Sequence, residues 1–186
     1  MCYNGGAVEK RALKILWRGM MALSICLSII LVLVTLDQVT KLFFMETEFS
    51  IIKGIIEFEP RLNDGAAFSS LRGERVFFIV FTVIALFVMF YILLTGWWSK
   101  HKFFRITLAV MIGGVIGNFI DRMMIGAVRD FIYLPPLNFV CNIADIAITA
   151  ACVMFIIYLF FIRDKEELEK KTKVSKQPQT DTTKNE

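Results

Sequence analysis

The sequence predicts an all-α membrane protein with four transmembrane helices and a small β-rich outer segment between the first two helices. Hydrophobic residues make up 56% of the 186 residues, and they occur in long blocks rather than mixed with polar ones. A bilayer core about 30 Å thick requires about 20 helical residues, and several blocks approach that length. The predicted spans cover residues 17–36, 76–95, 103–120 and 140–162.

The first block is expected to be a retained span rather than a signal peptide that is removed. The basic residues before and at the start of the block do resemble a positively charged leader: Lys10, Arg11, Lys14 and Arg18. However, the block is longer than the apolar region of a signal peptide, and the polar residues that follow, from Asp37 to Lys41, are not a small-residue cleavage site. In the third block, the Gly113-x-x-x-Gly117 spacing would allow a neighbouring helix to approach closely, with or without a dimer.

The positions of lysine and arginine predict the orientation of the spans. They gather before the first block, between the second and third blocks, and after the fourth block. These three regions lie on one side of a four-span protein, and the positive-inside rule places that side in the cytoplasm. The expected organisation is a cytoplasmic lead (1–16), a membrane domain (17–162) and a polar, disordered cytoplasmic tail (163–186). Within the membrane domain, residues 42–75 form the outer segment, where Phe49–Ile52 and Ile55–Glu59 are β-type in composition.

Composition argues against several classes of function. The formal charge of +4 is small, and no basic face is interleaved with stacking aromatic residues, so nucleic-acid binding is not expected. The four cysteines have no C-x-x-C spacing, and the single histidine, His101, lies on the predicted cytoplasmic side. We therefore expect neither a disulfide framework nor a metal site, and we predict no cofactor.

Two aspartates at the rims of consecutive spans carry the functional prediction. Asp130 follows the third block and Asp145 lies just inside the fourth, so both carboxyl groups emerge on the same side of the bilayer. A carboxyl group is costly in such a place and is seldom without a role. Two acids held close together can share one proton and activate a water molecule. The pair predicts an intramembrane aspartyl peptidase.

Other polar residues cluster at the same rim, and each also has a structural interpretation. The i, i+4 pair Asp37 and Lys41 is either a surface ion pair or a device that orients substrate. Asn63-Asp64-Gly65 reads as a turn, although Asn63 could bind an extended peptide. The remaining candidates are amide and guanidinium groups that could hold a carbonyl or a carboxylate: Asn118, Arg122 and Asn142.

Taken together, these motifs resemble those of the lipoprotein signal peptidases, also called signal peptidase II or aspartyl peptidase family A8. The motifs occur in the family's order over residues 20–162: Asp37-x-x-Thr40-Lys41, Asn63-x-Gly65-Ala66-Ala67-Phe68, Gly117-Asn118-x-x-Asp121-Arg122, Val128-x-Asp130-Phe131 and Asn142-x-Ala144-Asp145.

The resemblance implies a bacterial inner-membrane enzyme that removes the signal peptide of a prolipoprotein before its lipid-modified cysteine. Asp130 and Asp145 would be the catalytic dyad, placed near the outer leaflet. Seven residues would bind substrate: Asn63, Gly65, Asn118, Arg122, Asn142, Asp37 and Lys41. The expected partners are prolipoproteins and membrane lipids, and the enzyme is expected to be a monomer. Two departures from the family pattern, at Phe139–Asn142 and at Pro135-Pro136, affect the loop between the aspartates.

Three alternatives stay open at this point. An ion- or proton-coupled transporter subunit would also carry intramembrane acids, although it predicts acids near the midplane and two similar halves. A membrane scaffold explains Asp37 with Lys41 and could also explain Asp121 with Arg122. It leaves Asp130 and Asp145 with no cationic partner except Arg129. Serine–lysine catalysis has only the Ser50–Lys53 turn to support it.

Overall fold

The computed structural model describes residues 5–64, 75–95 and 101–163. Four helices in this part of the chain are long and apolar enough to cross a membrane, which confirms the predicted spans. They are α1 (Gly5–Phe44), α2 (Arg75–Thr95), α3 (Lys102–Met124) and α4 (Ile143–Ile157), which continues as the π-helical turn η3 (Tyr158–Arg163). The first helix is longer at both ends than the predicted span. Gly65 and the tail from residue 164 onward lie outside the described residues.

The predicted β-rich segment between the first two spans is confirmed, and the connection between the last two spans adds strands to it that the sequence analysis did not predict. The chain between α1 and α2 supplies β1 (Phe49–Ile52) and β2 (Ile56–Asn63). The connection between α3 and α4 supplies β3 (Val128–Leu134) and β4 (Phe139–Cys141). Together they form one antiparallel sheet in the order β1-β2-β3-β4. The backbone of β2 is paired by β3, which satisfies groups that would otherwise need water.

The start of the fourth span was also predicted too early. Val140 and Cys141 belong to β4, and α4 begins only at Ile143 because Asn142 caps it. An apolar strand that runs directly into an apolar helix gives one continuous hydrophobic block, so composition alone does not separate the two.

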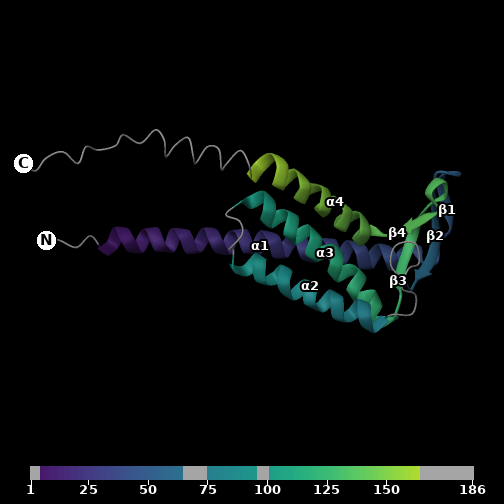
Figure 1. Ribbon diagram of the computed structural model, residues 1–186, viewed down its shortest axis with the longest axis horizontal. Helices are drawn as coiled ribbons and strands as arrows, with labels where there is room; N and C mark the ends of the chain where they lie inside the picture. Colours follow the sequence, from purple (N-terminus) through teal and green to yellow (C-terminus); the bar gives the residue numbers. More distant parts are fainter. Residues whose placement is uncertain (1–4, 65–74, 96–100, 164–186) are drawn as a thin grey trace, which may run out of the picture.

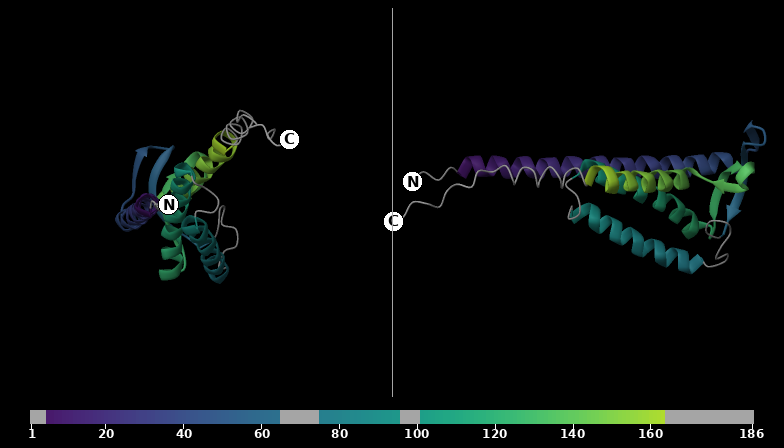
Figure 2. Two further views of the ribbon diagram at one scale, coloured as in Figure 1. Left: turned by 90° about the vertical axis from the view of Figure 1, so that its left-hand side faces the viewer. Right: turned by 45° about the horizontal axis from the view of Figure 1, so that its top comes forward.

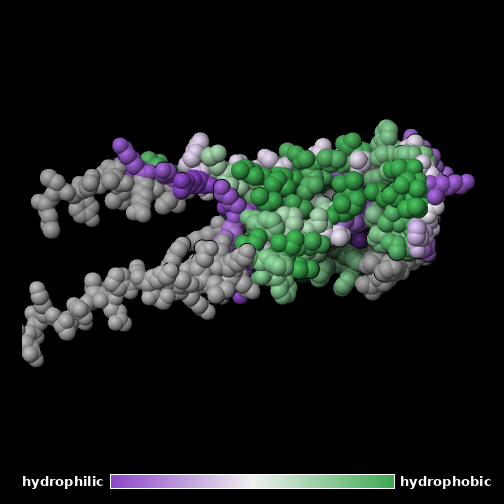
Figure 3. Space-filling view, turned by 90° about the horizontal axis from the view of Figure 1, so that it is seen from above, coloured by the Kyte–Doolittle hydropathy of each residue, from purple (hydrophilic) through white to green (hydrophobic). Residues whose placement is uncertain are grey.

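The sheet covers one end of the helix bundle. The N-terminal end of α1 and the C-terminal end of η3 lie at the other end (Figure 1). Figure 2 shows α1, α3 and α4 side by side, with the sheet crossing their ends. In the space-filling view of Figure 3, hydrophobic side chains cover the helical region, and hydrophilic ones gather on the protruding part of α1 and beyond the sheet. This distribution fits a helix bundle whose central part is surrounded by lipid.

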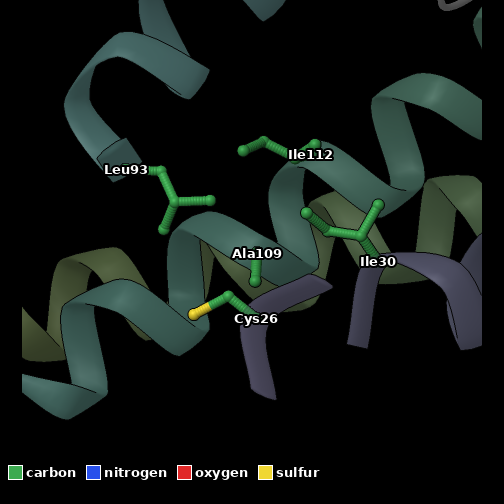
Figure 4. Packing of buried hydrophobic residues seen from close by; sticks show 5 residues of the cluster. All are labelled: Cys26, Ile30, Leu93, Ala109 and Ile112. Carbon is green, nitrogen blue, oxygen red and sulfur yellow. The ribbon is translucent and has the colours of Figure 1, made fainter. Parts of the chain in front are cut away.

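The central helix is α3, which packs against α1, α2 and α4. A buried hydrophobic cluster joins α1, α2 and α3 through Cys26, Ile30, Leu93, Ala109 and Ile112 (Figure 4). Glycines on α3 allow its close approach to two neighbours: a Cβ at Gly113 would lie 3.0 Å from Leu33 Cβ, and one at Gly114 would lie 2.7 Å from the Ala144 carbonyl oxygen. The Gly113-x-x-x-Gly117 spacing therefore serves packing within the chain.

Replacement of Gly117 should be costly. A Cβ there would lie 2.5 Å from Asp37 Oδ2 and 3.1 Å from Ala144 Cβ, and Asp37 is itself held in place by hydrogen bonds. We expect Gly117→Ala to lower the free energy of unfolding by about 1–3 kcal/mol, the usual cost of overpacking. Gly19→Ala is the matched control, because nothing lies within 4 Å of that position. Thermal unfolding in detergent measures both; equal midpoints would contradict the expectation.

Candidate active site

Asp145 is positioned by the cap of α4. The Asn142 side chain accepts a hydrogen bond from the Asp145 backbone N–H at 2.9 Å, and the Asp145 carboxylate accepts one from the Asn142 backbone N–H at 3.3 Å. This reciprocal capping box fixes the side chain at the helix N-terminus, where the helix dipole favours a negative charge. The Asn-x-x-Asp spacing before an apolar block was a signal for this cap that the sequence analysis did not use.

Asp130 is positioned by β3 and by an aromatic cluster beneath the sheet. The neighbouring Phe131 is buried and stacks on Phe44 of α1, with ring centroids 5.0 Å apart, and it also lies near Phe58 of β2. These contacts fasten the sheet to the end of α1 and turn the preceding residue, Asp130, into the site. Only 1% of Asp130 is exposed.

The side chain of Asn142 connects the two aspartates. Its Nδ2 donates to Asp130 Oδ1 at 2.6 Å, while its Oδ1 accepts from the backbone N–H of Asp145. One fully buried amide therefore touches both halves of the pair. The predicted convergence of the two aspartates is supported by this shared partner and by the electrostatic effect of Asp145 on Asp130.

Two further asparagines complete the hydrogen bonding of the pair. Asn63, at the end of β2, donates to Asp130 Oδ2 at 3.0 Å, and Asn118, on α3, donates to Asp145 Oδ1 at 2.7 Å. Each carboxyl oxygen thus accepts one hydrogen bond from a neutral group. No described cation forms a salt bridge with either carboxylate. Uncharged donors hold the two carboxyl groups in place, and they favour the ionised form less strongly than a nearby cation would.

The environment of Asp130 changes its acidity. Burial raises the pKa of the Asp130 carboxyl from 3.8 to about 6; the hydrogen bond from Asn63 opposes this rise, and the negative charge of Asp145 adds to it. A carboxyl group with such a pKa keeps its proton into the mildly acidic range. Asp145 is only partly buried, so it is the member of the pair that is more open to water.

Behind the pair lies a buried cluster of four charged side chains. Lys41 Nζ lies 2.8 Å from Asp37 Oδ2 and 3.2 Å from Asp121 Oδ2, and Arg129 also binds Asp121. Lys41 is completely buried, so the interpretation of Asp37 and Lys41 as a surface ion pair is wrong. Two cations and two anions leave the cluster without net charge, which limits the cost of burial.

Lys41 also controls the orientation of Asn118. Its Nζ donates to Asn118 Oδ1 at 3.0 Å, and the Asn142 Nδ2 donates to the same oxygen at 3.1 Å. With its oxygen occupied in this way, Asn118 presents its NH₂ group to Asp145. The buried cluster therefore acts on the aspartate pair through one amide.

Asp37 joins α1 to the start of α4. Its Oδ1 accepts from the Ala144 backbone N–H at 2.9 Å, one of the helix N-terminal donors that lack an intrahelical partner. Sequence reasoning missed Gln38 beside it. Gln38 Nε2 donates to the Gly117 carbonyl at 3.0 Å, and its Oε1 accepts from Arg129 Nη2 at 2.9 Å. The i, i+1, i+4 run of polar residues, Asp37, Gln38 and Lys41, was the available signal for this face.

Other sequence predictions have mixed outcomes. Arg129 is engaged by Asp121 rather than by the aspartate pair, and Asp121 pairs with Lys41 and Arg129 rather than with Arg122. Arg122 lies over the Phe78 ring, 4.8 Å from its centroid, and within electrostatic reach of Asp145 and Asp130. Gly65 lies outside the described residues.

A cysteine beside the pair is not a good nucleophile. Burial raises the pKa of the Cys141 thiol to about 11, and the negative charges of Asp145 and Asp130 add to that rise. The thiol therefore stays protonated at neutral pH, when a nucleophilic cysteine would need to be a thiolate. Within the described ranges, no group of three His, Cys, Asp or Glu side chains is placed to hold a metal ion.

The raised pKa of Asp130 predicts a pH-dependent stability. Between pH 4 and 6 the unfolded carboxyl ionises while the folded one keeps its proton, so the free energy of unfolding falls as pH rises. Relative to Asp130→Asn, the protein should lose up to about 3 kcal/mol from pH 4 to pH 7. Thermal unfolding of both proteins across this range measures the difference; a wild-type stability that stays constant or rises with pH relative to that of Asp130→Asn would contradict it.

The fold defines a class, the multi-pass membrane proteins. Residues 29–161 match the family model described as Signal peptidase (SPase) II. This chain belongs to that family.

Individual relatives agree with this assignment. The lipoprotein signal peptidase of Lactobacillus johnsonii is 35% identical over 142 residues, which is 73% of this chain and 92% of the relative. That of Lactobacillus gasseri is 38% identical over 67% of this chain and 80% of the relative. A solved structure of a bacterial membrane enzyme superposes with a TM-score of 0.66 at 29% identity, covering 73% of this chain and 87% of that one.

Proposed function

We propose that this chain is an aspartic endopeptidase that removes the signal peptide of diacylglyceryl-modified prolipoproteins by cleaving before the lipid-modified cysteine. Membership of the signal peptidase II family supports the reaction. The observation that carries the aspartic mechanism is the pair of carboxyl groups joined by the Asn142 side chain. Asp130 and Asp145 are the proposed catalytic residues, and the peptidase acts as a monomer in contact with membrane lipids.

In the proposed reaction, the two aspartates divide the proton transfers. Asp145, the more open member, takes a proton from water, whose oxygen attacks the carbonyl carbon of the scissile peptide bond. Asp130, whose pKa is raised to about 6, holds the shared proton and donates a hydrogen bond to the carbonyl oxygen. Bound substrate displaces water and favours the protonated form further. The tetrahedral intermediate breaks at the C–N bond when the leaving nitrogen receives a proton from the pair.

The polar neighbours are assigned two kinds of role. Asn63, Asn118 and Asn142 position the carboxyl groups, since each already donates to one of them. Asp37 and Lys41 are positioning residues that act through Asn118 and the start of α4, rather than direct contacts of the substrate. Arg122 remains a candidate for a direct contact with the substrate.

The placement of the pair suits a substrate that stays anchored in the bilayer. Both aspartates lie at the sheet end of the bundle. The N-terminal end of α1 and the C-terminal end of η3 lie at the opposite end (Figure 1). With the positive-inside rule, this supports cytoplasmic termini and an active site near the outer leaflet of the bacterial inner membrane. There, a lipid-modified cysteine can approach while its acyl chains remain in the hydrocarbon.

The proposal is tested with purified protein and a synthetic peptide that carries the cleavage sequence, with and without a diacylglyceryl group on its cysteine. We expect cleavage of the lipidated peptide on the N-terminal side of that cysteine, and at least about tenfold less cleavage of the unmodified one. Mass spectrometry of the products locates the cut. Equal cleavage of both peptides would overturn the lipid requirement, and a cut elsewhere would overturn the proposed specificity.

The transporter alternative is not favoured. It needs acids near the midplane of the spans, whereas both aspartates lie at one end of the bundle, beside the sheet. The serine–lysine alternative has no support at the site, because Ser50 and Lys53 are exposed on the β1–β2 hairpin. Lys41, which lies behind the aspartate pair, is held by Asp37, Asp121 and Asn118.

A further inference from the structure

A cavity lies far from the aspartate pair, at the other end of the α1–α3 interface. Its volume is about 530 Å³, and three cations line it: Arg18 from α1, and Lys102 and Arg105 from the start of α3. The rest of its wall is mostly apolar, formed by Met21, Ala22, Ile25 and Ile106. No acidic side chain lines it within the described part of the chain.

The two helices that line this cavity, α1 and α3, are joined to each other beside it. The Cys26 thiol of α1 donates to the Arg105 carbonyl oxygen of α3 at 3.7 Å, and Cys26 also belongs to the buried cluster that joins α1, α2 and α3. The Nε of Arg105 is buried and forms no hydrogen bond with the described residues, although the guanidinium lies close to the Cys26 thiol. A buried donor without a partner is uncommon in proteins and suggests that an acceptor is missing.

The cations lie at the depth of lipid headgroups. Between Arg18 and Asp37, α1 carries no charged residue, and at 1.5 Å per residue this stretch spans about 28 Å. The uncharged stretch of α3 between Arg105 and Asp121 spans about 24 Å. These lengths approach the hydrocarbon thickness of about 30 Å. The aspartate site therefore marks one surface of the bilayer, and the three cations mark the opposite surface.

We propose that this cavity binds an anionic phospholipid. The headgroup phosphate is held by Arg18, Lys102 and Arg105, and the first part of an acyl chain lies along Met21 and Ile25. Basic pockets between membrane helices at the cytoplasmic surface suit such headgroups. The apolar wall directly beneath the cations favours a lipid over free phosphate, because a soluble anion would leave that wall uncovered. This inference rests on the four spans and not on the peptidase activity.

The test measures which lipids stay bound to the full-length protein. The purified chain is mixed with equal amounts of dioleoylphosphatidylglycerol and dioleoylphosphatidylcholine, and the retained lipids are counted by native mass spectrometry. We expect preferential retention of the anionic lipid. Its affinity should fall about fivefold for each cation removed in Arg18→Gln/Arg105→Gln. Sodium phosphate and glycerol 3-phosphate, which lack acyl chains, should not displace it.

The matched control removes two charges from the same end of α1 without touching the cavity. Lys10→Gln/Lys14→Gln should keep the preference, because neither residue lines the cavity. An equal loss in both double variants would overturn the proposal and assign the preference to diffuse surface charge. Displacement by phosphate would identify a free-anion site instead. If the arginine variant does not fold, Lys102→Gln, an exposed position, provides the comparison.

Discussion

Asp130→Asn and Asp145→Asn are each expected to abolish cleavage of a lipidated precursor peptide, with a fall in rate of at least about 10²–10⁴-fold. Each change keeps the size of the side chain but removes a carboxyl group from the pair, so the shared proton and the base that activates water are lost together. The Asn142 and Asn118 amides still hold the surrounding backbone and helix cap. The variants should therefore fold and insert normally, as measured by thermal unfolding of the purified proteins.

Glu48→Gln is the matched control for these two variants. Glu48 is an exposed acid near the sheet, and its replacement removes the same charge without touching the pair. It should cleave at the rate of the unmodified protein. Full activity in either aspartate variant would exclude the acid-pair mechanism while leaving membership of the family intact. A loss of folding in both would instead assign Asp130 and Asp145 a structural role.

Lys41→Met is expected to destabilise the protein by about 3–5 kcal/mol, the usual cost of removing one partner from a buried ion pair. Lys41 is fully buried, and its loss leaves Asp37 and Asp121 with only Arg129 to balance them. Asn118 loses a donor as well, so its carboxamide is no longer held towards Asp145. Unfolding in detergent measures the first effect, and peptide cleavage measures the second.

Two further variants make this prediction specific. Lys53→Met removes an exposed lysine from the β1–β2 hairpin and should change stability little. Lys41→Met/Asp37→Asn restores the charge balance of the cluster and should recover part of the lost stability. If Lys41→Met is no worse than Lys53→Met, the buried cluster does not stabilise the fold in the way its contacts suggest.

The family was predictable, and the main residues of the candidate site could be named in advance, because both signals are local in the sequence. The motifs around Asp130 and Asp145 are short, and the apolar blocks mark the rims at which both residues lie. The strand β3 was not predicted, although Gly126 and Pro135 bound a run of β-branched and aromatic residues there. Its position between two spans led to its assignment as a loop.

Partnerships between distant residues could not be predicted in the same way. Nothing in the spacing of Asp121 and Arg122 indicates that Asp121 pairs with Lys41 of α1 and Arg129 of β3. Similarly, Asp37 accepts from the backbone of Ala144, more than a hundred residues away. Such contacts depend on how closely α3 approaches its neighbours. The glycines that permit this approach have no side chain, so the sequence does not indicate which residues they will contact.

The sequence by itself determined the four spans and the resemblance to signal peptidase II, and it predicts that the two aspartates emerge on the same side of the bilayer. These properties follow from the lengths of the apolar segments and from short motifs, and each of these signals lies within one continuous stretch of the chain. The tertiary structure alone decided that β3 joins the outer sheet and that Lys41 is buried. It also decided that Asn142 links the two carboxyl groups. Hydrogen bonds and charge pairing act over a few ångströms in space, and the packing of helices decides which groups come within that reach.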